Sequence, residues 1–391
     1  MYISICTLRF TDPYLQLFPR KSPNPTLNNS DFRYCPEKFL TSLKSFPQEN
    51  SSDRKTDHAT EHKIKRDKID KDYPGQERFW KKTILGCFMS SVDERELAEV
   101  RMIEEGLRKA YDGDAKGVVD AFSSLRDFAV QLIHLDLTAE NELDAKALII
   151  AMGDIGKLTA EKRMEIASIA AVHSLGEVAV EAADRKRESL ALKALSGLGG
   201  LALEFAEKGM DAVAKNAAET LGNLGKKSLE AKMEVLASLS ETYLMQLARK
   251  AMDENLPETW ATAVNFLVGI GVSSAGQEME NSSVGSAILL EELGIAAVRK
   301  RNEPQVKVII EALEKLGKEL SRQESKNALV QTVWTLETLR VLALEYGMET
   351  AVAAGKLTLE ALNTTGIPDE EQNLERIQEI KELHRRILKR S

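Results

Sequence analysis

Few residues of this sequence have the types and spacing that chemistry requires. His58 and His62 are four residues apart, a separation that places two imidazoles on one face of a helix, as in zinc sites. They lie in polar sequence with no third ligand nearby, so we expect no metal site there. The three cysteines, Cys6, Cys35 and Cys87, are 29 and 52 residues apart, which is too far for a local metal-binding motif.

A glycine-rich stretch from Gly197 to Ala202 matches the G-x-G-x-x-A pattern of dinucleotide-binding proteins. That pattern binds a pyrophosphate where a strand turns into a helix. Here it follows the helical run 190–195 instead of a strand. We therefore expect no bound nucleotide and no other cofactor.

Catalytic side chains are also sparse after residue 88. This part of the chain has three histidines, His134, His173 and His384, and no cysteine. His173 follows the expected core residue Val172, which favours an imidazole packed between helices. No Ser-His-Asp arrangement of these histidines has a second, local supporting signal in the sequence. The sequence therefore predicts no catalytic residues and no enzymatic activity.

Three residues are candidates for contact with a partner. Trp260 lies early in a predicted helix behind Pro257, where a partly exposed indole can anchor a binding surface. Arg385 and Arg386 lie in the basic stretch 384–390, although positive charge there also suits the C-terminus of a helix.

The elements that must position these residues are helices. From residue 92 onward apolar residues recur at three- and four-residue spacing, and no alternating strand-like run occurs. A Leu-Gly register begins at Gly176 and returns after steps of 23, 26, 23, 23, 23, 23, 23 and 26 residues, ending at Gly366. Ala248 and Arg340 replace the glycine at two of these positions. Leucine or another apolar residue stands one and four positions before most of them, which marks one buried stripe of a helix.

These glycines require a structural reason, because glycine inside a helix costs about 1 kcal/mol relative to alanine. Close packing of a neighbouring helix against the bare backbone supplies one. We therefore expect a close helix–helix contact at each of these glycines.

The repeat length indicates a fold. A unit of 23 residues fits one helix and a short turn, and two units make a hairpin of about 46 residues. With this period and the Leu-x-x-Leu-Gly register, residues 140–367 resemble the HEAT/armadillo-type α-solenoids. The resemblance implies an all-α, right-handed solenoid of helical hairpins, and such proteins typically act as binding scaffolds.

Composition changes abruptly near residue 88. All three cysteines, 7 of the 10 prolines and 12 of the 21 aromatic residues of the 391-residue chain precede residue 89. Residues 1–88 hold 16 Lys/Arg and 11 Asp/Glu, a net charge of +5, whereas residues 89–391 hold 37 and 50, a net charge of −13. The first segment has no sustained apolar period, so we expect it to be disordered. Two interpretations stay open: a genuine extension, or an over-extended reading frame with translation starting at Met89.

Three further segments follow from the pattern. We expect an N-terminal helical cap over 89–138, the repeat solenoid over 139–367, and a charged C-terminal capping helix over 368–391. A terminal cap of this kind is required because the last repeat must present a polar outer face.

Charge and composition exclude some classes of function. A net charge of −13 argues against nucleic-acid binding, and the apolar stretches are shorter than the ~20 residues of a membrane helix. A helical region without cysteine suits a reducing compartment, so we expect a cytoplasmic protein. The leading hypothesis is a non-enzymatic scaffold for protein partners of unknown identity. The alternatives are a HEAT-like enzyme that holds a ligand in its groove and a self-assembling structural protein, and the sequence leaves the oligomeric state open.

Overall fold

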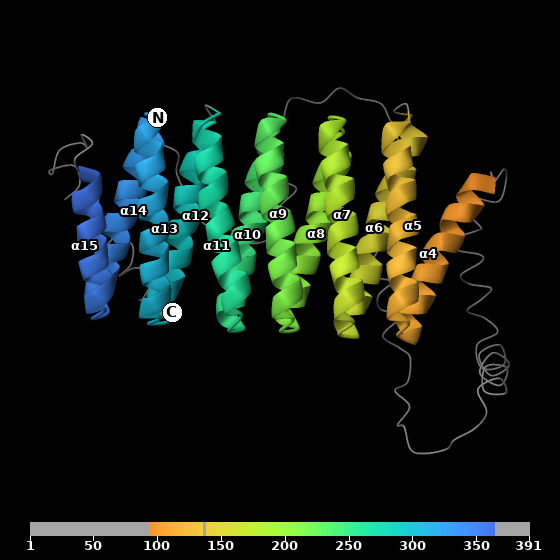
Figure 1. The fold of residues 1–391 in the computed structure, drawn as a ribbon, viewed down its shortest axis with the longest axis horizontal. Helices are drawn as coiled ribbons and strands as arrows, with labels where there is room; N and C mark the ends of the chain where they lie inside the picture. The colour runs from red at the N-terminus through yellow and green to blue at the C-terminus, as the bar shows by residue number, and fades with distance from the viewer. Residues whose placement is uncertain (1–93, 136–137, 278, 364–391) are drawn as a thin grey trace, which may run out of the picture. The chain divides into compact units, whose positions relative to one another are not determined.

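The computed structural model describes residues 94–135, 138–277 and 279–363, all within one compact unit. In these ranges it forms twelve α-helices and no strand, which confirms the all-α prediction (Figure 1). The expectations for residues 1–88 and 368–391 lie outside the described residues. The helices are α4 (Glu94–Asp112), α5 (Ala115–His134), α6 (Ala139–Glu161), α7 (Glu165–Asp184), α8 (Glu188–Glu207), α9 (Asp211–Glu230), α10 (Glu234–Asp253), α11 (Pro257–Ala275), α12 (Glu280–Arg299), α13 (Glu303–Arg322), α14 (Lys326–Glu345) and α15 (Glu349–Asn363).

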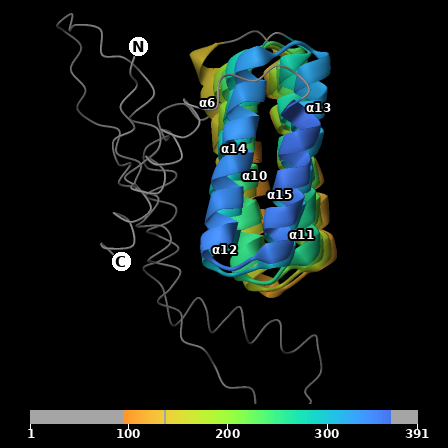
Figure 2. The same cartoon turned by 90° about the vertical axis from the view of Figure 1, so that its left-hand side faces the viewer.

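The helices pack in two layers. Each helix contacts the next helix in sequence and the one after that. Even-numbered helices therefore lie side by side in one layer, the even layer, and odd-numbered helices form the other, the odd layer (Figure 2). Consecutive helices are antiparallel because short turns join them, so the helices of one layer run in the same direction. The expected cap helices α4 and α5 continue both layers through their contacts with α6 and α7.

The repeat has a constant length. From α7, which starts at Glu165, to α15, which starts at Glu349, each helix begins 23 residues after the previous one. The 26-residue step between Gly199 and Gly225 is therefore not an insertion. Gly222 is the true 23-residue successor of Gly199, and Gly225 lies about one turn further along the same helix, α9.

The turns before α7 to α11 and before α13 to α15 share one backbone conformation. Two residues before a helix start, φ is positive at Arg163, Lys186, Gly209, Lys232, Asn255, Arg301, Glu324 and Gly347. The next amide then donates back across the turn, as Met233 N does to Ser228 O at 2.8 Å. This is the bond that closes a Schellman motif at a helix C-terminus. The predicted C-terminal caps at Gly209 and Gly347 are confirmed, and the structure shows that lysine, arginine, asparagine or glutamate occupies the same position elsewhere.

Glycines of the repeat accommodate a side chain from the next helix of the same layer. A methyl group added at Gly294 would lie 2.6 Å from the Leu339 side chain, and one added at Gly317 would lie 2.8 Å from the Leu362 side chain. In both pairs the partner is 45 residues downstream. The expected close approach is thus confirmed at the described glycines of the register, and the partner is a side chain of the helix two units along, such as Thr220 for Gly176 and Ile270 for Gly225.

Two helices, α7 and α8, have the length and mean hydropathy of a membrane-spanning helix. In the structure more than half of each apolar window is buried in the helix stack. Core helices of a folded domain meet the same criterion.

Candidate functional site: a buried carboxyl between α10 and α12

Glu241 interrupts the apolar stripe of α10. The equivalent positions one unit before and one unit after it hold Ala218 of α9 and Val264 of α11, and both are buried. The Glu241 residue is buried as well, with 2% of its surface exposed. A carboxyl at this depth requires hydrogen-bond partners, because an unpaired buried polar group is costly.

Two serines of α12 supply these partners. Ser282 Oγ donates to Glu241 Oε2 at 3.1 Å, and Ser286 Oγ donates to Glu241 Oε1. The serines are four residues apart, so they lie on the same face of α12. Gly285 leaves space beside the carboxyl, since a methyl group added there would lie 3.8 Å from Glu241 Oε2. We call Glu241, Ser282 and Ser286 the carboxyl cluster.

Further hydroxyls lie next to this cluster, between α11 and α12. Ser283 Oγ donates to the Gly271 carbonyl at 2.9 Å and lies 3.2 Å from Ser274 Oγ. Ser274 Oγ in turn donates to the Ile270 carbonyl at 2.8 Å. Backbone carbonyls therefore accept from these two serines, which leaves Ser282 and Ser286 as the hydroxyls that bind the carboxyl.

The buried position changes the acidity of the cluster. Burial raises the pKa of Glu241 from 4.5 to about 7, and the hydrogen bonds from Ser286 and Ser282 oppose this rise. The carboxyl consequently gains and loses its proton near neutral pH. All three side chains are buried, so a substrate cannot reach them. The arrangement can hold a proton between two helices, but it is not an accessible catalytic site.

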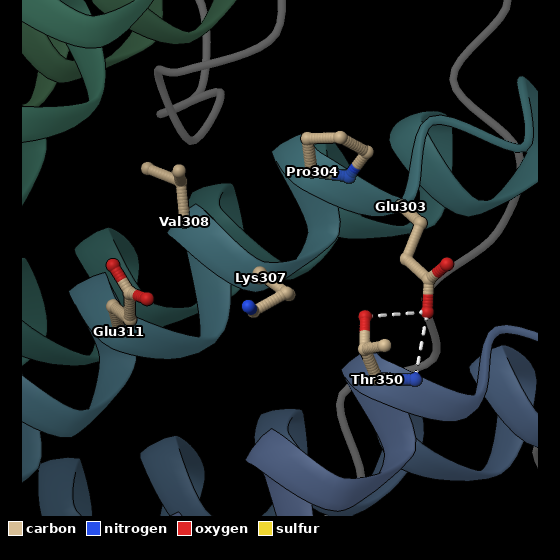
Figure 3. Close-up of a pocket in the computed structure, with 6 residues that line it drawn as sticks. All are labelled: Glu303, Pro304, Lys307, Val308, Glu311 and Thr350. Carbon is tan, nitrogen blue, oxygen red and sulfur yellow. Dashed lines mark hydrogen bonds between the residues drawn. The ribbon is translucent and has the colours of Figure 1, made fainter.

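A hollow of about 330 Å³ lies between the N-terminal parts of α13 and α15 (Figure 3). Glu303 Oε1 accepts from the Thr350 amide and from the Thr350 hydroxyl, both at 2.8 Å. The hydroxyl bond is the main cause that lowers the pKa of Glu303. Glu303 thereby caps the N-terminus of the next helix in its layer, as Asp211 does for Thr259 in α11. The Glu303 carboxylate is thus already hydrogen-bonded at the N-terminus of α15.

Residues of α13 form most of the lining of this hollow: Glu303, Pro304, Lys307, Val308 and Glu311, with Thr350 from α15. The lining contains carboxylates and a lysine, but it has no histidine or cysteine that could act as a base or nucleophile. The side chains that line the hollow can contact a ligand, but the carboxylates and the lysine are its only groups that could take part in catalysis.

His134 joins a surface network that the sequence did not reveal. Its Nε2 lies 2.6 Å from Glu181 Oε1, and Arg185 Nη2 lies 3.0 Å from its Nδ1. Because arginine can only donate, Nδ1 accepts and Nε2 carries the hydrogen that Glu181 accepts. The network links α5 to α7, and its histidine and glutamate are partly exposed.

The residues predicted from the sequence to contact a partner are Trp260, Arg385 and Arg386. The prediction of a partly exposed Trp260 is wrong, because the residue is 4% exposed in α11. Pro257 occupies the first turn of that helix as expected, and Trp260 belongs to the hydrophobic core. Arg385 and Arg386 lie outside the described residues. His173, expected between helices, is exposed on α7.

The structure describes the glycine-rich stretch, whereas His58 and His62 lie outside the described residues. Gly197 to Ala202 lie inside the continuous helix α8, so they form no phosphate-binding turn. Among the residues that the structure describes, no group of three or more His, Cys, Asp or Glu side chains is arranged to hold a metal ion. The carboxyl cluster was missed in the sequence, although the charged residue within an apolar stripe was a visible signal.

No protein-family profile matches the chain, and no curated protein matches its sequence. Among solved structures, the chain is similar to one described as a "Circular tandem repeat protein with novel repeat topology and enhanced subunit contact surfaces". The identity is 15%, the TM-score is 0.41, and the match covers 73% of this chain and 72% of that one. The constant 23-residue unit identifies the chain as a helical repeat protein.

Proposed function

We propose that this protein is a non-enzymatic scaffold of the HEAT/armadillo type, which binds protein partners along the outer face of its helix stack. The supporting observation is the uninterrupted 23-residue period from α7 to α15. Each layer therefore presents equivalent outward positions again and again, and repeat proteins use such extended surfaces for binding.

The character of the surface supports the same proposal. Ion pairs connect neighbouring helices of one layer, such as Lys215 with Glu258 at 3.0 Å and Lys250 with Glu207 at 3.3 Å. Exposed pairs of this kind contribute only about 0–1 kcal/mol each. Large exposed apolar side chains are spread over different helices, as with Val235 on α10 and Ile288 on α12. A partner would therefore be recognised by a mixture of charge and scattered apolar contacts.

Charge reversal on one layer at a time tests the proposal. One variant carries Lys193→Glu and Arg249→Glu on the even layer, and the matched variant carries Lys315→Glu and Lys356→Glu on the odd layer; all four residues are exposed. Affinity purification with chemical cross-linking would be compared among the wild type and both variants, after circular dichroism confirms that each is folded. We expect a stoichiometric partner that one variant loses and the other keeps. A wild type that repeatedly recovers no stoichiometric partner would contradict the proposal.

Self-assembly is a second candidate function, because two leucines near the end of the described helix stack are exposed. Leu344 of α14 is 61% exposed and Leu357 of α15 is 66% exposed. Light scattering on a sizing column distinguishes this function from partner binding. A concentration-dependent oligomer that Leu357→Glu disrupts would favour self-assembly, whereas a monomer at high concentration excludes it. The enzyme alternative would rest on the α13–α15 hollow, whose lining lacks a catalytic arrangement.

A further inference from the structure

We propose that the carboxyl cluster is a proton-controlled contact that fastens α10 to α12 when Glu241 is protonated and loosens it when Glu241 is ionised. The contact lies within the even layer, near the centre of the described helices (Figure 1). It would be a built-in control of the spacing between two helices that share one outer face. The inference does not depend on the identity of any partner.

The carboxyl cluster is a buried polar part of the α10–α12 contact. One unit later, the positions equivalent to Glu241 and Ser286 hold Val264 of α11 and Ile309 of α13, and both are buried apolar residues. Between α10 and α12, part of the contact is instead a carboxyl against two serines. Its strength must therefore depend on the charge of that carboxyl.

The protonated form suits the buried site. A neutral carboxyl has one O–H that can donate to a serine hydroxyl while its other oxygen accepts, and serine hydroxyls can either donate or accept. The ionised form can only accept, and the two serines are the donors that it receives here. An ionised group at this depth without a cation is strongly disfavoured.

Within the part of the chain that the structure describes, no cation forms an ion pair with Glu241. The helices packed against α10 are α8, α9, α11 and α12, and none of their charged groups is among the causes that shift the pKa of Glu241. The charged and titratable groups that the structure describes on these helices and on α10 itself are Glu188, Lys193, Glu204, Glu207, Asp211, Lys215, Glu219, Lys226, Lys227, Glu230, Glu234, Tyr243, Arg249, Lys250, Asp253, Glu258, Glu291, Glu292 and Arg299.

The direction of the effect follows from proton linkage. The pKa of Glu241 is raised in the folded protein from 4.5 to about 7, so the folded state binds this proton more tightly than an opened state does. The stabilisation is fully present below pH 4.5 and is lost as the pH rises to about 7. With a pKa of 4.5 in the opened state and about 7 in the folded state, the equilibrium constant for local opening increases about tenfold between pH 6 and pH 8.

Hydrogen–deuterium exchange on the full-length protein tests the proposal. Protection of peptides from α10 and α12 would be compared at pH 6 and pH 8, after correction for the intrinsic effect of pH on exchange. In the wild type we expect about a tenfold loss of protection at pH 8 in these two helices, while peptides from α7 and α8 change much less. Equal corrected protection at both pH values would overturn the proposal.

Variants assign the effect to the cluster. Glu241→Gln keeps the shape and hydrogen bonds without the titrating group, so we expect it to abolish the pH difference in α10 and α12. Glu241→Leu, which restores an apolar stripe, gives the same readout if the glutamine variant folds poorly. Glu314→Gln is the matched control, because Glu314 accepts from Thr358 in the next helix of its layer at 3.3 Å but is only partly buried. A pH difference that persists in both Glu241 variants would overturn the proposal.

Discussion

At the scale of single residues, several glycines of this protein act as sockets, meaning positions without a side chain against which a side chain of the next helix in the same layer packs. The Leu339 side chain packs against Gly294, and the Ile270 side chain packs against Gly225. A methyl group added at either glycine would lie 2.6 Å from that side chain. Gly200 differs, because nothing lies within 4 Å of an added methyl group there. The same residue type thus has two physical roles in one repeat: close packing at some positions and no packing role at others.

This contrast predicts opposite effects of the same substitution. Gly294→Ala should destabilise the protein by about 1–3 kcal/mol, because it overpacks the contact with Leu339. Gly200→Ala should stabilise it by about 0.5–1 kcal/mol, because alanine has the higher helix propensity. Urea unfolding followed by circular dichroism measures both changes. Equal changes in the two variants would contradict the socket role.

At the scale of the elements, the turns are more uniform than their sequences. Lys232 and Gly209 occupy the same position of two successive turns and have φ values of 60° and 69°. The left-handed region costs a residue with a Cβ roughly 1–2 kcal/mol, and glycine avoids that cost. The turn conformation is therefore imposed by the packing of the helices, which holds lysine where glycine is preferred.

Exchanging these two residue types tests that conclusion. Lys232→Gly should raise the free energy of unfolding by about 0.5–1 kcal/mol, since the released strain exceeds the extra entropy of glycine in the unfolded chain. Gly209→Lys, the reciprocal change one unit earlier, should lower it by a similar amount. Thermal unfolding would show the two shifts. A loss of stability in Lys232→Gly would indicate that the lysine side chain contributes more than its backbone costs.

At the scale of the whole molecule, the constant unit makes the helices interchangeable. Removing residues 188–233 deletes α8 and α9 with their turns and leaves every other helix in its own layer and direction. Gly156, which now meets Leu201, would meet Leu247 instead. The socket would again receive a leucine, so the shortened chain retains a continuous core.

We therefore expect the deletion of residues 188–233 to give a folded protein with a single cooperative thermal transition. The matched control removes residues 188–235. The two extra residues rotate α10 by about 200° relative to the preceding turn, because a helix turns about 100° per residue. Its buried stripe would then face solvent, and the cooperative transition should be lost. Similar transitions in both variants would show that register does not control the stacking.

The sequence alone determined the helices, the approximate unit and the need for close packing at glycine. These features are local: apolar spacing of three and four residues depends on the 3.6-residue turn of a helix, and it repeats along the chain. The same local signals placed Pro257 and Gly209 correctly at a helix start and a helix end.

Only the tertiary structure decided which residues meet. The partner of Gly294 lies 45 residues away, and the serines that bind Glu241 lie 41 and 45 residues away. These contacts depend on how each turn orients the next helix and on which helix shares its layer, and neither is encoded in local spacing. For the same reason the sequence misplaced Trp260: its position early in a helix was correct, but the face it occupies is set by the neighbouring helices, which bury it.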